Sequence, residues 1–64
     1  MHRRIRVRET TETVTILSST DEGTYRIIWH RSDGEPEEEF LLTPDDGDTV
    51  EDAVAKDLKR RLGP

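Results

Sequence analysis

The most constraining feature of the sequence is a change in the spacing of its apolar side chains. Up to residue 43, apolar and polar residues alternate in short segments, a period typical of strands with one solvated face. From residue 49 onward, apolar positions recur at the spacing of a helix face. We therefore predict an α+β fold, a small antiparallel β-meander of three to four strands with one C-terminal α-helix packed on one face. It forms a single domain, 1–64, with strands at about 3–8, 12–19, 24–31 and 37–43 and the helix at about 49–62.

The segment 24–31 is the strongest predicted strand, and a polar turn at 20–23 precedes it. Ile27 and Trp29 stand in one phase of the alternation, and Ile28 stands in the other. Because both phases hold an apolar side chain, we expect this strand to be central. The expected core comprises Ile5, Val7, Val14, Ile16, Ile27, Trp29 or its phase neighbour Ile28, Phe40, Leu42, Val54 and Leu58.

The predicted helix has two candidate N-caps. Thr49 is followed three residues later by Asp52, and Asp48 is followed three residues later by Glu51, so either pair resembles a capping box. The acids at the start and the bases at the end both complement the helix dipole. Gly and Pro at 63–64 are expected to end the helix.

Composition limits both the core and the location of the protein. The chain has 64 residues, of which 30% are apolar. Ordering them costs roughly 100 kcal/mol, so either the sheet is well paired or the domain dimerises. There is no cysteine for a disulfide or a thiolate metal site, and the charged N-terminus has no apolar signal segment. We therefore expect a cytoplasmic protein, and no apolar run long enough for a membrane span is present.

Charge is segregated along the chain beneath a net charge of −5. Residues 1–8 hold four arginines and no acid, and residues 33–52 hold ten acids and no base. Residues 53–64 hold four bases and one acid. In one interpretation, the basic ends pair with the acidic middle across neighbouring strands and the helix. In the other, one signed surface faces a partner.

Candidate catalytic and metal-binding groups are few. His30 is the only histidine expected inside the sheet, and as a general base it would need a positioned carboxylate and a cleft. One sheet with one helix offers little cleft, so we expect no enzymatic activity and no cofactor. The cluster of Asp45, Asp46 and Asp48 does not meet the spacing of the twelve-residue calcium loop, so we expect no metal site.

Two partial resemblances to known families are present. Residues 20–25 and the Gly-Asp-Thr-Val-Glu-Asp-Ala segment at 47–53 resemble the HicB-type antitoxin domain, which would cover about 14–62. The segment 25–43 before a helix is similar to the small DNA-binding domains of tyrosine integrases. In that family the second hairpin strand is basic, whereas this chain has glutamates at 37–39. We assign the chain to neither family.

We expect a small non-enzymatic protein-interaction module of the inhibitor, antitoxin or adaptor type. It would act through an acidic surface that meets a basic protein, or through an exposed sheet face. On that face Leu17, Ile28 and Leu41 would form an exposed apolar patch. Such patches usually indicate an interface, here with a partner or with a second copy of the chain. The predicted partner-binding residues are Glu37, Glu38, Glu39, Asp45, Asp46, Ile28 and Leu41.

Two alternatives stay open at this point. The first is a nucleic-acid-binding domain in which Arg4, Arg6 and Arg8 project from one face of the first strand and contact phosphates. The pI of about 4.9 counts against it, since dedicated binders of nucleic acid are usually basic. The second is a designed or artificial domain with no natural partner.

Overall fold

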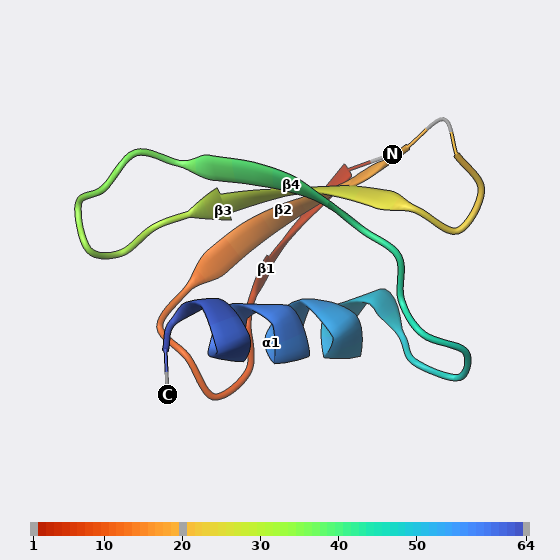
Figure 1. The fold of residues 1–64 in the computed structure, drawn as a ribbon. Helices are drawn as coiled ribbons and strands as arrows, with labels where there is room; N and C mark the ends of the chain where they lie inside the picture. The colour runs from red at the N-terminus through yellow and green to blue at the C-terminus, as the bar shows by residue number, and fades with distance from the viewer. Residues whose placement is uncertain (1, 20, 64) are drawn as a thin grey trace.

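The computed structural model describes residues 2–19 and 21–63 and has an α+β fold (Figure 1). Four antiparallel strands form one sheet in the order β1-β2-β3-β4, and helix α1 follows them. This architecture confirms the predicted meander with a C-terminal helix. Thr20 and Pro64, predicted in a turn and at the helix end, lie outside the described residues. The elements are β1 (His2–Arg6), β2 (Thr13–Ser18), β3 (Tyr25–His30), β4 (Glu38–Leu42) and α1 (Val50–Arg61).

The first strand is shorter than the sequence predicts, because the chain reverses in a tight turn. β1 ends at Arg6, and the N–H of Val7 donates to the carbonyl of Glu12 at 2.8 Å. Glu9 then has a φ of 63°, in the left-handed region that residues other than glycine rarely adopt. Arg8, predicted in the strand, therefore lies in the turn. The other elements agree with their predicted bounds to within one residue at each end.

Thr49 caps the N-terminus of α1, which decides between the two predicted caps. Its Oγ1 accepts a hydrogen bond from the N–H of Asp52 at 3.1 Å. At the other end, the N–H of Leu62 donates to the carbonyl of Leu58 at 2.8 Å. Among the described residues, no helix is both long and apolar enough to cross a membrane.

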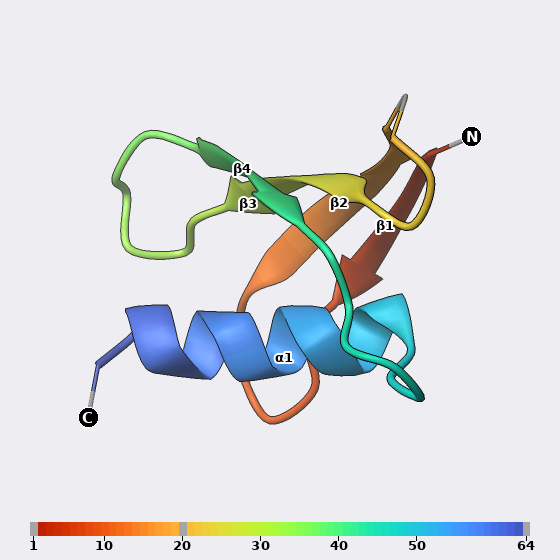
Figure 2. The same ribbon diagram turned by 45° about the vertical axis from the view of Figure 1, so that its right-hand side comes forward.

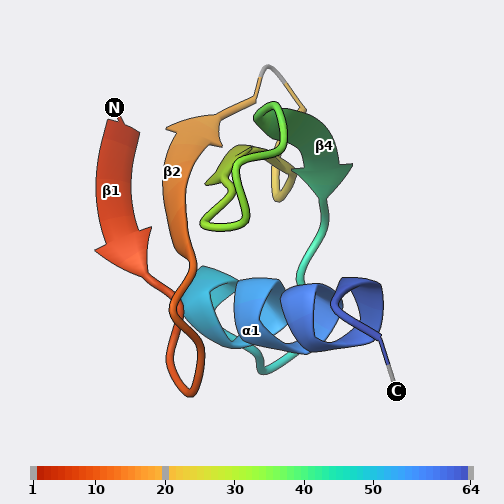
Figure 3. The same ribbon diagram turned by 90° about the vertical axis from the view of Figure 1, so that its left-hand side faces the viewer.

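The core lies between α1 and one face of the twisted sheet (Figure 2). In the view turned by 90° from Figure 1, the helix runs beneath the strands from β2 toward β4 (Figure 3). Trp29, and not Ile28, points to this side. Ile5, Phe40 and Leu42 were expected in the core but are only partly buried, because they belong to the edge strands β1 and β4. The buried cluster consists of Val7, Val14, Ile16, Ile27, Trp29, Val54, Ala55 and Leu58.

Candidate functional site: the open face of the sheet

The second face of the sheet carries no helix or strand of the described chain (Figure 2). Directly opposed residues of antiparallel strands point to the same side, so the registers arrange its side chains in cross-strand rows. One row across all four strands holds Arg4, Thr15, Ile28 and Glu39. We term these side chains the open face: His2, Arg4 and Arg6 of β1, Thr13, Thr15 and Leu17 of β2, Arg26, Ile28 and His30 of β3, Glu39 and Leu41 of β4, and Glu37 just before β4.

Three apolar residues lie on the open face, as the alternation predicted. Leu41 is 63% exposed, while Leu17 and Ile28 are half-buried by their neighbours. Leu17 and Leu41 stand in one row with Arg26 between them, and Ile28 lies diagonally from both in the next row. Diagonal neighbours are within reach of long side chains. The three residues therefore form one small apolar area, interrupted by the guanidinium of Arg26.

Arg4 and Arg6 differ from the other lysines and arginines in the part of the chain that the structure describes. Of the ten lysines and arginines, eight form an ion pair with a carboxylate within the described residues. Arg4 and Arg6 have no carboxylate partner there, although the Nε of Arg6 donates a long hydrogen bond of 3.4 Å to the carbonyl of Thr10. Both are exposed and both lie on the open face. The arginine charge that has no carboxylate partner among the described residues thus lies on one side of the sheet.

His30 is held between two side chains at the end of the open face. Its Nε2 lies 2.7 Å from Thr15 Oγ1, and its Nδ1 lies 2.5 Å from Glu37 Oε2. A hydroxyl, an imidazole and a carboxylate in that order also occur in hydrolases, where a cleft and an oxyanion site complete the machinery. Here the three groups lie on an uncovered sheet face, and none of them lines any of three hollows found elsewhere on the described surface. The contacts fix the imidazole ring in one orientation.

The acidic stretch does not form one surface. Glu37 and Glu39 lie on the open face, while Glu38 points to the opposite side and pairs with Arg31. Glu39 Oε2 accepts from Arg26 Nε at 2.8 Å. Six of the ten acids between residues 33 and 52 have a lysine or arginine ion-pair partner in the described chain, and a seventh, Glu37, contacts the imidazole of His30. The interpretation that the charges neutralise each other internally is therefore supported for most of this segment.

Asp45 and Asp46 lie apart from the open face. They are exposed in the turn between β4 and α1, where the N–H of Asp48 donates to the carbonyl of Asp45 at 3.0 Å. Neither carboxylate has an ion-pair partner within the part of the chain that the structure describes. The predicted partner-binding residues therefore fall on two surfaces: Ile28, Leu41, Glu37 and Glu39 on the open face, and Asp45 and Asp46 on this turn.

The three arginines predicted to track phosphates do not lie together. Arg8 Nη2 pairs with Asp52 Oδ1 at 2.9 Å, on the side of the sheet that α1 covers. The turn after β1 places it there, since the strand ends before the alternation reaches residue 8. Arg3 binds Glu51 in the same first turn of the helix, at 2.5 Å. Only Arg4 and Arg6 remain on a common face.

Glu12 is a buried carboxylate that the sequence analysis did not single out. It is 5% exposed and accepts hydrogen bonds from Trp29 Nε1 at 2.8 Å and from the Ser32 N–H at 3.1 Å, besides the hydroxyls of Ser32 and Thr11. The hydrogen bonds from Ser32 lower the pKa of Glu12 below its usual range, against the opposing effect of burial. Nothing in its local sequence separates Glu12 from a surface glutamate. Its contacts join the β1–β2 turn to the loop after β3.

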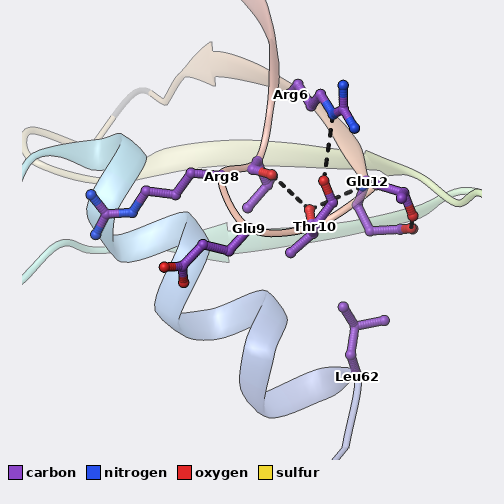
Figure 4. Close-up of a pocket in the computed structure, with 8 residues that line it drawn as sticks. Arg6, Arg8, Glu9, Thr10, Glu12 and Leu62 are labelled. Atoms are coloured by element: carbon purple, nitrogen blue, oxygen red, sulfur yellow. Dashed lines mark hydrogen bonds between the residues drawn. The ribbon is translucent and has the colours of Figure 1, made fainter.

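A shallow hollow of about 730 Å³ lies beside the β1–β2 turn (Figure 4). Leu62 forms one wall, and the guanidinium groups of Arg6 and Arg8 lie on different sides of the turn (Figure 4). Because the Glu12 carboxylate is occupied by its donors, the hollow gathers no set of free polar groups. Within the described residues, no three histidine, aspartate or glutamate side chains are arranged to hold a metal ion.

Comparison with models of protein families, with curated proteins and with solved structures finds no match for this chain. The partial resemblances to the HicB-type antitoxins and to the tyrosine integrases are therefore not supported by any match. The function has to be argued from the open face itself.

Proposed function

We propose that the chain is a small non-enzymatic protein-interaction module, located in the cytoplasm, and that its binding surface is the open face. One observation carries this proposal. The two arginines without a carboxylate partner among the described residues lie on the same uncovered face as Leu41, which is 63% exposed. An apolar area beside unpaired charge is typical of a protein-binding surface, in which apolar contact supplies affinity and charge supplies specificity.

The acidic surface is the weaker of the two predicted binding surfaces. Most acids of segment 33–52 have a basic partner within the chain, and a partner protein would have to compete with those ion pairs. Glu35, Asp45 and Asp46 have no such partner within the described residues, but they lie in two separate exposed loops, with Asp45 and Asp46 in a single turn. A nucleic-acid partner is disfavoured because Glu37 and Glu39 share the open face with Arg4 and Arg6 and would repel phosphates.

The proposal is tested by comparing two double variants as baits in an extract of the source organism. Replacing Ile28 and Leu41 with Ser removes the apolar area of the open face, whereas replacing Asp45 and Asp46 with Asn removes the unpaired acids of the turn. We expect the first variant to lose the proteins that the parent chain captures and the second to keep them. The reverse result would transfer the function to the acidic turn. Capture of the same proteins by both variants would contradict a role for either surface.

A further inference from the structure

We infer that the open face binds the open face of a second copy of this chain, with the two-fold axis parallel to the strands. This inference rests on the proposed function and names its partner. It follows from the distribution of charge across the sheet. The basic residues without partners stand on the edge strand β1, and the acids stand on or beside the opposite edge strand β4.

A two-fold axis parallel to the strands places β1 of one copy over β4 of the other. Each cross-strand row of one copy then lies over the same row of the other copy, in the reverse strand order. Arg4 and Glu39 belong to one row, so Arg4 of each copy then faces Glu39 of the other. Arg6 shares the next row with His30, which binds Glu37, so Arg6 faces Glu37 of the second copy. Each unpaired arginine thereby meets a carboxylate, twice per dimer.

The alternative two-fold axis, perpendicular to the strands within the interface, would place β1 over β1 and β4 over β4. Because this axis reverses the order of the rows, Arg4 would face Arg4 or Arg6 of the second copy, and Glu39 would face Glu39 or Glu37, when the axis passes through or beside their row. Like charges directly opposite each other are unfavourable. Electrostatics therefore selects the arrangement in which the two copies run parallel, as in aligned packing of two sheets.

The carboxylates can take a second donor without losing their own. Glu39 binds Arg26 through Oε2, and an ionised carboxylate has about four acceptor sites. At the centre of the face, the axis places Ile28 of one copy over Thr15 of the other, so the half-buried isoleucine meets a methyl-bearing side chain. The sheet is twisted (Figure 2), so the central strands approach most closely and the long arginines bridge the edges.

The size of the face sets the expected strength of this contact. Four strands about 4.8 Å apart, with five or six residues of about 3.4 Å each, give roughly 350 Å² in projection. That is small beside the surface of about 800 Å² that each partner buries in a standard complex. We therefore expect weak association, detectable only toward the upper end of the concentrations used below.

The test measures self-association by sedimentation equilibrium, from about 10 μM to about 1 mM chain at low ionic strength. Arg4→Glu and Glu39→Arg each place like charges opposite each other in a homodimer, so each variant alone should bind itself at least about tenfold more weakly than the parent. In an equimolar mixture, Glu at position 4 faces Arg at position 39, and Arg4 of the other chain faces Glu39. Only the mixture should associate like the parent chain.

Two controls separate this effect from net charge and from unfolding. Asp46→Arg changes the charge by the same amount as Glu39→Arg but lies off the open face, so its self-association should match or exceed that of the parent. Circular dichroism shows whether each variant is folded. If a single variant is unfolded, Arg6→Glu with Glu37→Arg provides a second pair in the same geometry, and restoration in that mixture decides the question.

Three results would overturn the inference. A parent chain that stays monomeric at about 1 mM excludes the dimer, and the proposed protein-binding function then stands or falls on the bait experiment alone. A dimer that the mixture of variants does not restore has a different geometry. A monomer that binds a DNA duplex with steep salt dependence, and loses that binding in Arg4→Glu, has an open face that binds nucleic acid and not a second copy.

Discussion

The two faces of the sheet are built from alternate residues of the same strands, yet they differ in almost every property. On the covered face, Val14 and Ile27 are 0% exposed, and the buried ring nitrogen of Trp29 donates to Glu12. On the open face, Ile28 is half-buried, Leu41 is 63% exposed, and the arginines at its β1 edge have no carboxylate within the described chain. Apolar burial and satisfied polar groups lie on one face, and partly exposed apolar side chains with arginines unpaired among the described residues lie on the other.

This difference shows how a chain with few apolar residues divides them. With 30% apolar residues, the chain can cover one face of a four-stranded sheet and no more. On the covered face these residues are buried against a single helix. The second face is left mainly to threonine, histidine and charged side chains, with three apolar residues among them. Stability and binding are therefore expected to respond to different substitutions.

The strongest test of that expectation replaces two neighbours of β3 that point to opposite faces. Trp29→Ala removes a 2%-exposed ring and one donor to Glu12, so it should lower the free energy of unfolding by about 3–5 kcal/mol. Ile28→Ala should lower it by less than about 1 kcal/mol. Urea unfolding measures both free energies. Circular dichroism is the signal, because Trp29 is the only tryptophan and its replacement removes the tryptophan fluorescence. Equal losses would mean that the second face is also covered.

A smaller loss of unfolding free energy is expected when the buried carboxylate of Glu12 is replaced. Glu12→Gln can keep an oxygen for the N–H groups of Trp29 and Ser32, but it removes the negative charge that strengthens these hydrogen bonds and places an amide NH2 against the hydroxyls of Ser32 and Thr11, so it should cost about 1.5–3 kcal/mol of unfolding free energy. Because folding lowers the pKa of Glu12, its contribution is complete above the pKa of the unfolded chain and disappears as the pH falls through the folded value. The difference between parent and variant should therefore shrink below about pH 5.

The difference in unfolding free energy between the parent chain and Glu12→Gln reports the contribution of Glu12 separately from that of the other acids. Glu9 and Asp33 also have lowered pKa values, through Lys59 and Arg31 respectively, but they are present in both chains and cancel. Glu35→Gln, at an exposed position, serves as the matched control and should leave stability within about 0.5 kcal/mol. A difference between parent and Glu12→Gln that stays constant down to about pH 3 would contradict the role of the ionised carboxylate.

The smallest expected effect compares two arginines of the N-terminal segment. Arg8 pairs with Asp52 in the first turn of α1, so Arg8→Gln should cost about 0.2–1 kcal/mol, and this cost should fade in about 1 M salt. Arg4→Gln breaks no ion pair and should leave the unfolding free energy unchanged within error, while self-association weakens. Thermal unfolding at low and high salt measures both. A larger cost for Arg4→Gln would place Arg4 in an intrachain contact.

Local sequence patterns predicted most of the fold because strands and helices have different periods. The alternation in β3 and the helical spacing in α1 were strong enough to place both to within one residue. The predicted end of β1 was wrong because no glycine in the sequence marks the turn. Glu9 takes a positive φ there, and the turn is held by the Thr10 hydroxyl, which donates to the carbonyl of Val7 at 2.7 Å. That contact depends on the folded turn and leaves no pattern in the sequence.

The candidate site was only half predictable for a related reason. The alternation placed Ile28, Leu41 and Leu17 on the second face, and the registers confirm that placement, while their role in binding stays a prediction. Arg8 was placed with Arg4 by extending the same alternation past the true end of the strand. Glu12 was missed, since burial of a single carboxylate is decided by residues 17 and 20 positions away along the chain.

The sequence by itself determined the order and type of the elements, the cap at Thr49 or its neighbour, and the side of each strand on which an apolar residue falls. These features depend on the spacing of residues within a short segment, because that spacing decides which side chains share a face of a helix or strand. Only the tertiary structure decided which charges neutralise each other. Arg3 finds Glu51 across 48 positions of chain, while Arg4, its neighbour, points to the other face and finds none within the described residues. Ion pairing depends on distance in space, and the position of the helix over one face sets that distance.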